Sequence, residues 1–512
     1  MNLYKSRYLL VLLLITAALS ACKKQWDDRT AITDQQLDKN LMQKIQENTN
    51  LSTFAGYLTR LGYDRLLSAS KTYTVWAPDN QALQGIDPAV VADTAKLRLF
   101  VNNHIANQAY LTSNVQVSLR IRTLIGKKIT FTPTLVEEAT ITSANQYVSN
   151  GVLHIINATL APKLNISEYI RSLTTVGALH KAYILRQDTV LIDTAKATVA
   201  SVDPVSGKPI LVPGTGTVSQ NKYFNRVANL ASEDSLYTYF VLTDAAYNTE
   251  RSKVSRFFTT VSGSADTTMN ILAAYNVLKD VAVRGVILPA NLPNFLISVK
   301  GVEVPVNRAA IVQSYRASNG MVYVMSSMDF KLANKITPIV IEAEKPSFFT
   351  NTSRRNNIQY RTKKDPSQNI YSDLLVSGSD LPSAYYAAYR LSGLYTCQYR
   401  VVWRAINDFG YATPTNISQR LGFSQVTLAA DGTYTGLVSF PYTAVTPLNY
   451  SEQQLSGAPV SVVPGATINS TGGTLNVSKY SSVNMFLQGA ASTALNTNIF
   501  TADYIKLYPI LL

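Results

Sequence analysis

The chain has 512 residues, and its three histidines and two cysteines are the side chains best suited to acid–base, nucleophilic or metal chemistry. His104 and His154 lie in apolar segments, and His180 follows a short helical pattern. No HExxH or CxxC spacing groups these residues. The sequence also lacks a Gly-x-Ser-x-Gly elbow, a phosphate-binding loop and a dinucleotide fingerprint. We therefore expect each histidine to be structural and the protein not to be an enzyme.

Cys22 stands in a context suited to lipid attachment. A short positive region is followed by an apolar run, Tyr8 to Leu19, which is too short to span a bilayer. The tetrapeptide Leu19-Ser20-Ala21-Cys22 resembles the bacterial lipobox, in which the cysteine thiol takes the lipid. The alternative is an ordinary secretory signal with an incidental cysteine. We favour lipidation, so that palmitate-like acyl chains on Cys22 anchor a lipoprotein to the membrane.

The residues after Cys22 indicate where that anchor is held. Lys23 stands in place of the Asp that retains many lipoproteins at the inner membrane, and the stretch through Asp28 resembles surface-export signals of Bacteroidetes. The resemblance implies the outer membrane, with the protein facing the cell exterior. We assign residues 1–21 to the signal peptide and residues 22–40 to a lipidated tether, whose coil of about 18 residues reaches roughly 20–25 Å.

The overall charge does not indicate a nucleic-acid partner. The formal net charge is +14, or +12 without Lys5 and Arg7 of the signal, but the basic residues are scattered instead of forming a patch. Hydrophobic residues make up 46% of the chain, which is ample for several cores. After lipidation only Cys397 remains, so no intramolecular disulfide is possible. We expect Cys397 to be a small packed residue, not a nucleophile.

Residues 41–164 contain four motifs in a recognisable order. Leu41 to Leu67 has apolar residues at helical spacing, and Thr72 to Leu83 reads as a strand, a proline stop and a helix-capping Asp. The remaining motifs are Leu97 to Ile105, Thr123 to Lys128, and Val148 to Pro162 with its Asn-Gly turn. Together they resemble the fasciclin (FAS1) family, an α+β fold.

The sequence departs from the fasciclin pattern at three positions. Trp76 stands where Phe is usual, Asp79 where Thr is usual, and Asn103 replaces the Tyr of the family's Tyr-His pair. The same order of motifs recurs less cleanly in residues 165–338, which we predict to be a second, divergent FAS1 domain. A long insertion at about 187–234 has the Gly and Pro content of a loop or exposed hairpin, and we favour a tolerated surface insertion over a recognition loop.

Residues 339–512 contain short alternating strands between Gly, Pro and Asn turns, which predicts an all-β domain. The opening strand, Val340 to Glu344, and the closing strand, Ala502 to Leu507, resemble those of jelly-roll carbohydrate-binding modules of the galactose-binding-like type, and Tyr389 to Val401 fits a strand motif of the same modules. That resemblance implies a β-sandwich with a structural Ca²⁺ held by Glu342, Glu344 and Asp503. An equally acceptable interpretation has one glutamate facing solvent and the other paired with a Lys or Arg.

Sugar binding requires flat apolar faces beside hydrogen-bonding groups. The residues that we consider for this role are Tyr385, Tyr386, Trp403, Tyr411 and Tyr434. Trp403 is mid-strand, so a core position is favoured over a platform.

Three functional classes follow from these observations. The first is a surface-anchored, non-catalytic lipoprotein that captures glycan or adheres to polymers, because fasciclin domains are adhesion and ligand-binding modules. The second is a scaffold that docks to an outer-membrane nutrient transporter. The third, an enzyme, is the least favoured, because a hydrolase would need paired carboxylates in a cleft. The partners that we expect are the membrane and a glycan or polysaccharide, with outer-membrane transporter proteins as the partners in the scaffold alternative.

Overall fold

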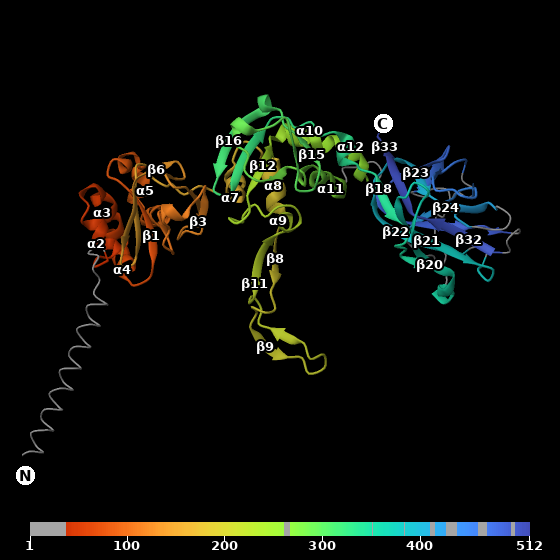
Figure 1. The fold of residues 1–512 in the computed structure, drawn as a ribbon, viewed down its shortest axis with the longest axis horizontal. Coiled ribbons are helices and arrows are strands. Elements are labelled where there is room, and N and C mark those ends of the chain that lie inside the picture. The colour runs from red at the N-terminus through yellow and green to blue at the C-terminus, as the bar shows by residue number, and fades with distance from the viewer. Residues whose placement is uncertain are drawn as a thin grey trace, which may run out of the picture. The chain divides into compact units, whose positions relative to one another are not determined.

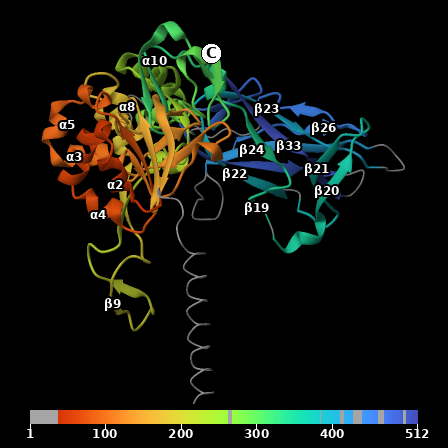
Figure 2. The same ribbon diagram turned by 60° about the vertical axis from the view of Figure 1, so that its left-hand side comes forward.

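The computed structural model describes residues 37–260, 267–350, 352–382, 385–409, 415–425, 438–458, 468–492 and 497–511 (Figures 1 and 2). The signal peptide, Cys22 and most of the predicted tether lie outside these residues. The chain forms two compact units. Unit 1 holds the residues up to Tyr169 together with Leu230–Leu236 and Arg316–Gly320, and unit 2 holds Ile170–Asn229, Tyr237–Tyr315 and Met321–Leu512.

A layer of helices begins unit 1. They are α2 (Leu41–Gln46), α3 (Ser52–Arg60), α4 (Tyr63–Ser68), α5 (Pro88–Ala92) and α6 (Thr94–Asn102). A single 3-10 turn at Thr49–Leu51 separates α2 from α3. Gly62, with φ +75°, separates α3 from α4.

A mixed sheet forms the rest of unit 1, in the order β2-β1-β7-β6-β5-β4-β3. The strands are β1 (Tyr73–Pro78), β2 (Ile105–Ala106), β3 (Leu119–Arg122), β4 (Lys128–Phe131), β5 (Leu135–Val136), β6 (Ala139–Val148) and β7 (Gly151–Ile156). β1 and β7 are parallel neighbours, and all six residues of β1 are buried. Alternation along β1 sends Val75 into the core under the helices and Trp76 into a second core on the opposite face. Burial on both faces explains why β1 contains so few polar residues.

The Asn-Gly turn before β7 joins three separate segments through one side chain. The Asn150 carbonyl oxygen accepts the backbone N–H of Leu41, the first residue of α2, at 2.8 Å. Its amide group donates to the carbonyl oxygens of Leu67 and Ala69 at 2.7 and 2.8 Å. Asn150 is buried, so these three hydrogen bonds are shielded from water.

Gly151 completes this turn because no other residue fits there. A Cβ atom at this position would lie 2.0 Å from the carbonyl oxygen of Tyr73 and 2.8 Å from the Leu41 side chain. Its φ of +154° also lies in the region that side chains other than that of glycine rarely adopt. The predicted Asn-Gly turn is therefore confirmed. The structure shows in addition that the backbones of β1 and β7 approach each other closely at this turn.

The second Asn-Gly turn, at Asn319 and Gly320, has the same bonding pattern. The Asn319 carbonyl oxygen accepts the backbone N–H of Ile166 at 2.9 Å, and Ile166 is the first residue of α7 (Ile166–Ser172). The Asn319 amide donates to the carbonyl oxygens of Leu230 and Ser232, both at 2.9 Å. In both turns the two acceptor carbonyls are two residues apart, so the local geometry is repeated.

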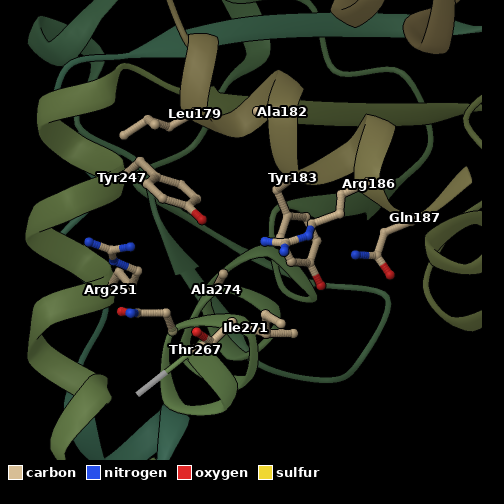
Figure 3. A pocket seen from close by; sticks show the side chains of 11 residues that line it. Leu179, Ala182, Tyr183, Arg186, Gln187, Tyr247, Arg251, Thr267, Ile271 and Ala274 are labelled. Carbon is tan, nitrogen blue, oxygen red and sulfur yellow. The ribbon is translucent and has the colours of Figure 1, made fainter. Parts of the chain in front are cut away.

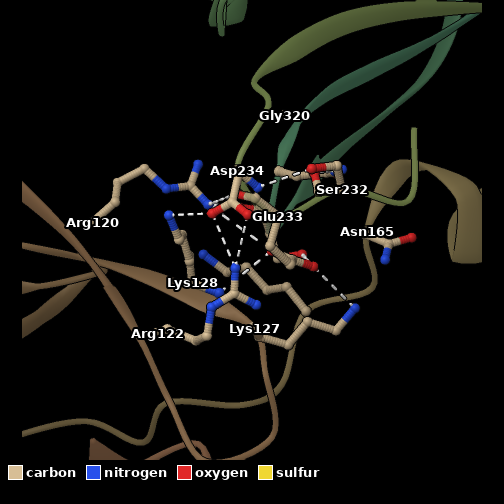
Figure 4. A network of polar contacts seen from close by, with 12 residues as sticks. Arg120, Arg122, Lys127, Lys128, Asn165, Ser232, Glu233, Asp234 and Gly320 are labelled. Carbon is tan, nitrogen blue, oxygen red and sulfur yellow. Dashed lines mark hydrogen bonds and ion pairs between the residues drawn. The ribbon is translucent and has the colours of Figure 1, made fainter. Parts of the chain in front are cut away.

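A group of ion pairs surrounds Glu233 in unit 1 (Figure 4). Glu233 is nearly buried and receives the Lys127 ammonium at 3.3 Å and the Ser318 hydroxyl at 2.8 Å. Asp234 pairs with Lys128 at 2.5 Å and with Arg122 at 3.0 Å. The other members are Arg120, which donates to the Ser318 carbonyl, and Glu168, which pairs with Lys127. Charges of β3 and β4 thus hold the segment Leu230–Leu236, which also supplies acceptors to Asn319.

The first part of unit 2 has a four-stranded sheet in the order β13-β12-β17-β16. The strands are β12 (Tyr237–Leu242), β13 (Ala282–Arg284), β16 (Ile311–Ala317) and β17 (Gly320–Met325), and the helices are α8 (Ala178–Arg186), α9 (Lys222–Arg226), α10 (Asp244–Ser255), α11 (Thr267–Leu278) and α12 (Leu332–Lys335). A small hairpin pairs β14 (Phe295–Ile297) with β15 (Glu303–Pro305). The strand order repeats the order β2-β1-β7-β6 of unit 1.

The predicted insertion is a pair of hairpins. β8 (Asp188–Ile192) pairs with β11 (Thr217–Asn221), and β9 (Val199–Val202) pairs with β10 (Pro209–Leu211) (Figure 1). We call residues 188–221 the hairpin arm. Its exposed apolar side chains are Val190, Leu191, Ile192, Val199, Val202, Val205 and Ile210.

From Ile339 onward the described residues form strands, loops and one 3-10 helix at Thr352–Asn357. One sheet has the order β18-β33-β23-β29-β28, with β27 also on β23; these strands are β18 (Ile339–Glu342), β33 (Tyr504–Ile510), β23 (Gln398–Arg404), β29 (Thr474–Val477), β28 (Ile468–Thr471) and β27 (Glu452–Gln454). We call this sheet the terminal sheet. Its strands β18 and β33 pair, so the first and last strands of this region are adjacent.

Two further sheets share one core with the terminal sheet. The second contains β19 (Phe348–Phe349), β22 (Tyr386–Leu394), β30 (Ser481–Gly489), β24 (Ile417–Gln425), β25 (Val438–Ser439) and β26 (Thr443–Val445). The third contains β20 (Ile358–Lys364), β21 (Ile370–Gly378), β32 (Thr497–Ala502) and β31 (Ala491–Ser492). No helix among the described residues is long and apolar enough to cross a membrane.

We expect Asn150→Ala to destabilise the protein by about 3 kcal/mol, because the variant leaves one backbone donor and two carbonyls without their partner in a buried site. Urea unfolding followed by circular dichroism measures the change. The exposed Asn225, which makes a single side-chain hydrogen bond to Gln220, provides the matched control Asn225→Ala. Equal stability of the two variants would contradict the role that we assign to Asn150.

Candidate functional site

Two of the five aromatic residues that we predicted to contact sugar are buried. Tyr385 and Trp403 are at most 1% exposed and belong to the core that the three sheets share, so neither ring is accessible to a ligand. Trp403 points inward because it is opposite Ile505, another core residue. Tyr386 is half-buried, with its ring against Phe348 and Phe486. Tyr411 and Tyr434 lie outside the described residues.

The three carboxylates predicted to hold Ca²⁺ do not converge. Glu342 is exposed on β18, opposite Tyr504, whereas the Asp503 carboxylate receives Arg404 Nη1 at 2.7 Å. One buried oxygen of Glu344 has no hydrogen-bond partner, but a single oxygen is far from the six or more ligands that Ca²⁺ takes. In the part of the chain that the structure describes, no three His, Cys, Asp or Glu side chains are placed to share a metal ion. The predicted residues therefore do not fit a calcium site.

The positive charge beside the Asp503 carboxylate comes from the Arg404 guanidinium instead of a metal ion. Besides Asp503, its guanidinium donates to Asp365 at 2.9 Å and to the Tyr450 carbonyl at 2.8 Å. The guanidinium also lies 5.2 Å from the centre of the Tyr371 ring. A side-chain cation thus joins the start of β33 to two loops.

The outer face of the terminal sheet carries a different group of aromatic and charged side chains. Along β33, Ile505 and Leu507 point into the core, so Tyr504, Lys506 and Tyr508 point outward. On the adjacent strand β23, Arg400 is opposite Tyr508. We call Gln398, Arg400, Tyr504, Lys506 and Tyr508 the outer tyrosine face.

Each tyrosine of this face is held beside a cation. The Arg400 guanidinium lies 4.4 Å from the centre of the Tyr508 ring, and the Lys506 ammonium lies 3.9 Å from the centre of the Tyr504 ring. Glu452 on β27 accepts hydrogen bonds from the Tyr504 hydroxyl at 2.9 Å and from Lys506 at 3.3 Å. Half-exposed rings therefore stand next to hydrogen-bonding groups on a regular sheet.

Such an arrangement is chemically suited to a sugar ring, which presents C–H patches flanked by hydroxyls. Aromatic rings pack against the patches, while carboxylate, ammonium and guanidinium groups bond the hydroxyls. Sequence reasoning missed these tyrosines. The signal was present, because the alternation Tyr504-Ile505-Lys506-Leu507-Tyr508 assigns both tyrosines to one face as soon as Ile505 and Leu507 are assigned to the core.

The three histidines are buried and neutral. His104 receives the Leu160 N–H on Nε2 at 3.0 Å and donates from Nδ1 to the Phe100 carbonyl at 2.8 Å. Burial lowers the pKa of His104 to about 4, partly offset by the bond to Phe100. A proton added at Nε2 would face another N–H donor, which explains why the ring stays neutral.

His154 and His180 follow the same rule. His154 accepts the Asn145 N–H and bonds the Tyr110 carbonyl, while His180 accepts the Leu242 N–H and bonds the Tyr239 hydroxyl. Burial lowers the pKa of His154 and lowers that of His180 to about 3. Both nitrogens of all three rings are engaged, as expected of structural histidines.

Cys397 is partly buried, and burial raises the pKa of its thiol to about 11. The thiol is therefore protonated at neutral pH, which makes it a poor nucleophile.

Comparison with known proteins identifies part of the chain. The Fasciclin domain model matches residues 49–162, so a fasciclin domain lies there. Over 133 residues the chain is 28% identical to transforming growth factor-beta-induced protein ig-h3 of Sus scrofa, covering 24% of this chain and 19% of that protein. The chain therefore spans about a fifth of that relative's length.

Two solved structures are similar to longer stretches. The FAS1 domain pair of the insect cell adhesion molecule Fasciclin I has 14% identity and a TM-score of 0.23, covering 57% of this chain and all of that one. A family 35 carbohydrate binding module from Clostridium thermocellum has 13% identity and a TM-score of 0.19, covering 34% of this chain and 99% of that one. With TM-scores this low, neither likeness indicates a function.

The His104 geometry predicts a loss of stability in acid. Unfolded His104 takes up a proton below about pH 6.5, whereas the folded form does so only near pH 4. Between these values the unfolded chain binds more protons, so acidification favours unfolding. We expect His104 to contribute about 2 kcal/mol of the loss between pH 7.5 and about pH 5, measured by urea unfolding at both values. His104→Gln should lack that part of the loss, and an unchanged pH dependence would contradict the assignment.

Proposed function

We propose that this protein is a non-catalytic lipoprotein that binds glycan through the outer tyrosine face of its terminal sheet. The observation that carries the proposal is the pairing of two half-exposed tyrosine rings with Arg400 and Lys506 on one sheet face. The fasciclin domain at residues 49–162 is consistent with a binding or adhesive role for the chain as a whole. Capture or adhesion in polysaccharide uptake is the role that we infer.

The proposed architecture is two fasciclin domains followed by a jelly-roll β-sandwich. Support for a second fasciclin domain in residues 165–338 comes from the repeated strand order and from the matching bonds of Asn150 and Asn319. Support for a jelly-roll in residues 339–512 comes from the adjacent first and last strands and from the core that the sheets share.

The absence of catalysis is part of the proposal. It is supported by the side chains that would have to react: the three histidines have both nitrogens bonded, and the Cys397 thiol is protonated at neutral pH. Asp373 and Asp408 come close enough to share Arg361, but each carboxylate is held by that guanidinium, so neither is free to act as a base.

The proposed location is the outer membrane, with lipid on Cys22 and the folded part facing outward. Support comes from the lipobox-like tetrapeptide that ends at Cys22 and from the Lys23 to Asp28 stretch after it. A tether before α2 would hold the binding face away from the lipid surface.

A second candidate function is docking to another envelope protein, for example an outer-membrane transporter. The observation that favours it is the hairpin arm, in which Val205 is 95% exposed and Val190 and Val202 are each 60% exposed. Exposed aliphatic side chains in such number are unusual for a surface that meets only water. In this alternative the fasciclin domain and the arm form a scaffold.

We expect the wild-type chain produced in a lipoprotein-processing bacterium to carry acyl chains, and Cys22→Ser to lack them, because only a thiol at this position takes the lipid. Mass spectrometry of the N-terminal peptide and partition into detergent measure the difference. Cys397→Ser is the matched control and should be lipidated as in the wild type. Detergent partition that is the same for the wild type and Cys22→Ser would contradict the anchor.

We expect Tyr508→Ala to bind glycan roughly tenfold more weakly than the wild type, because the variant loses the ring that packs against the sugar. A glycan array with the full chain selects the ligand, and isothermal titration calorimetry then measures its affinity.

Tyr360→Ala is the matched control, since Tyr360 is 58% exposed on β20 of another sheet. The proposal requires that this variant bind as the wild type does. Absence of binding across a broad array, or equal loss in Tyr360→Ala and Tyr508→Ala, would reject the glycan site and leave docking through the hairpin arm as the better function.

A further inference from the structure

A cavity of about 310 Å³ lies between three helices in the first part of unit 2 (Figure 3). The residues that line it belong to α8, α10 and α11, and Gln187, which directly follows α8, completes the wall. This volume is at the lower end of the range for small-molecule sites. The outer tyrosine face lies on other elements, so the cavity is a separate feature.

Two arginines from different helices line this cavity. Arg186 comes from α8 and Arg251 from α10, and in Figure 3 the Tyr247 hydroxyl points into the space between them. The Arg251 guanidinium also lies 5.8 Å from the centre of the Tyr247 ring, so these two side chains are neighbours in the cavity wall. Among the residues that the structure describes, neither arginine forms an ion pair with a carboxylate.

The acidic side chains of the surrounding helices are already engaged. α8 and α11 contain none, and α10 contains Asp244 and Glu250. Asp244 accepts the Leu179 N–H at 2.8 Å, and buried Glu250 pairs with Lys253 at 2.8 Å. Neither carboxylate lines the cavity, so its described walls carry positive charge without compensation.

The remaining wall is apolar with a few amides. Leu179, Ile271 and Ala274 provide aliphatic surface, and the rings of Tyr183 and Tyr247 provide flat faces. Gln187 and Asn270 add groups that both donate and accept hydrogen bonds. The combination suits a small ring with an anionic substituent better than a bare inorganic ion, which would leave the apolar surface without contacts.

We propose that this cavity binds a carboxylate carried on a six-membered ring, with the carboxylate between Arg186 and Arg251. Guanidinium groups pair with carboxylates through two parallel hydrogen bonds, which gives both affinity and orientation. The ring packs on Tyr247 and the aliphatic wall, and Asn270 and Gln187 bond any hydroxyl groups. A uronic acid and an aromatic acid share this chemistry, and they are distinguished by experiment.

The test uses the full chain and four probes in isothermal titration calorimetry: glucuronate, benzoate, glucose and inorganic phosphate. Binding of glucuronate alone identifies an acidic sugar as the ligand class, and binding of benzoate identifies an aromatic acid. Either result supports the proposal if Arg186→Gln and Arg251→Gln each weaken binding by roughly ten- to a hundredfold, as the loss of a charge-assisted hydrogen bond implies.

Lys222→Gln is the matched control, because Lys222 is an exposed cation on α9 that does not line the cavity. This control should bind as the wild type does, and thermal unfolding should show that all variants are folded. Arg186 is exposed, so its replacement tests the site even if the Arg251 variant is unstable. The proposal is overturned if neither carboxylate binds, if glucose or phosphate binds as tightly and Arg186→Gln weakens that binding equally, or if Lys222→Gln weakens carboxylate binding as much as the arginine variants do.

Discussion

One buried asparagine amide constrains the centre of unit 1. Asn150 links the start of α2, the end of α4 and the turn that feeds β7, while Gly151 allows that turn to touch β1. β1 and β7 are parallel neighbours separated by more than seventy residues in sequence, so no short connection can set their register. The amide and the close approach at Gly151 supply that register, and the helices on one face and Trp76 on the other pack on the strand pair that results. Asn319 makes the matching bonds at the second Asn-Gly turn, so the same local constraint occurs at both turns.

Local patterns in the sequence predicted the parts of the fold that local physics determines. The Asn-Gly turn before β7, the hairpins of the insertion and the strands after Ile339 all follow from residue type and spacing. The candidate sites depended on information that short patterns do not contain. Trp403 and Tyr385 lie in the core because of the residues that they pack against. The Asp503 carboxylate pairs with Arg404, which belongs to a strand almost a hundred residues earlier in the chain. The cavity between α8, α10 and α11 was not foreseen, because its walls come from positions spread between Leu179 and Ala274.

Charge in this protein is used in two different ways. Some ions are neutralised inside: Lys335 is buried with Asp280 at 2.6 Å, and its ammonium also bonds two carbonyls at the end of α11. Such pairs are poor sources of net stability but are costly to break, so they favour one packing over others. Other cations stand at the surface beside aromatic rings or around a cavity, and among the described residues Arg400, Arg186 and Arg251 form no ion pair with a carboxylate. These surface cations account for part of the net positive charge and place strongly polar groups beside the apolar surfaces that we consider for binding.

Because Arg404 joins Asp365 and Asp503, this part of the structure does not need a metal ion to link them. A metal ion that joins strands must be recruited from the surroundings, and its occupancy falls whenever the free ion becomes scarce. A guanidinium that is covalently part of the chain has a high effective concentration at Asp365 and Asp503 under every external condition, since it cannot diffuse away. Folding alone therefore links Asp503, at the start of β33, to Asp365 through Arg404. The link between Asp365 and Asp503 therefore does not change when calcium in the surrounding water becomes scarce.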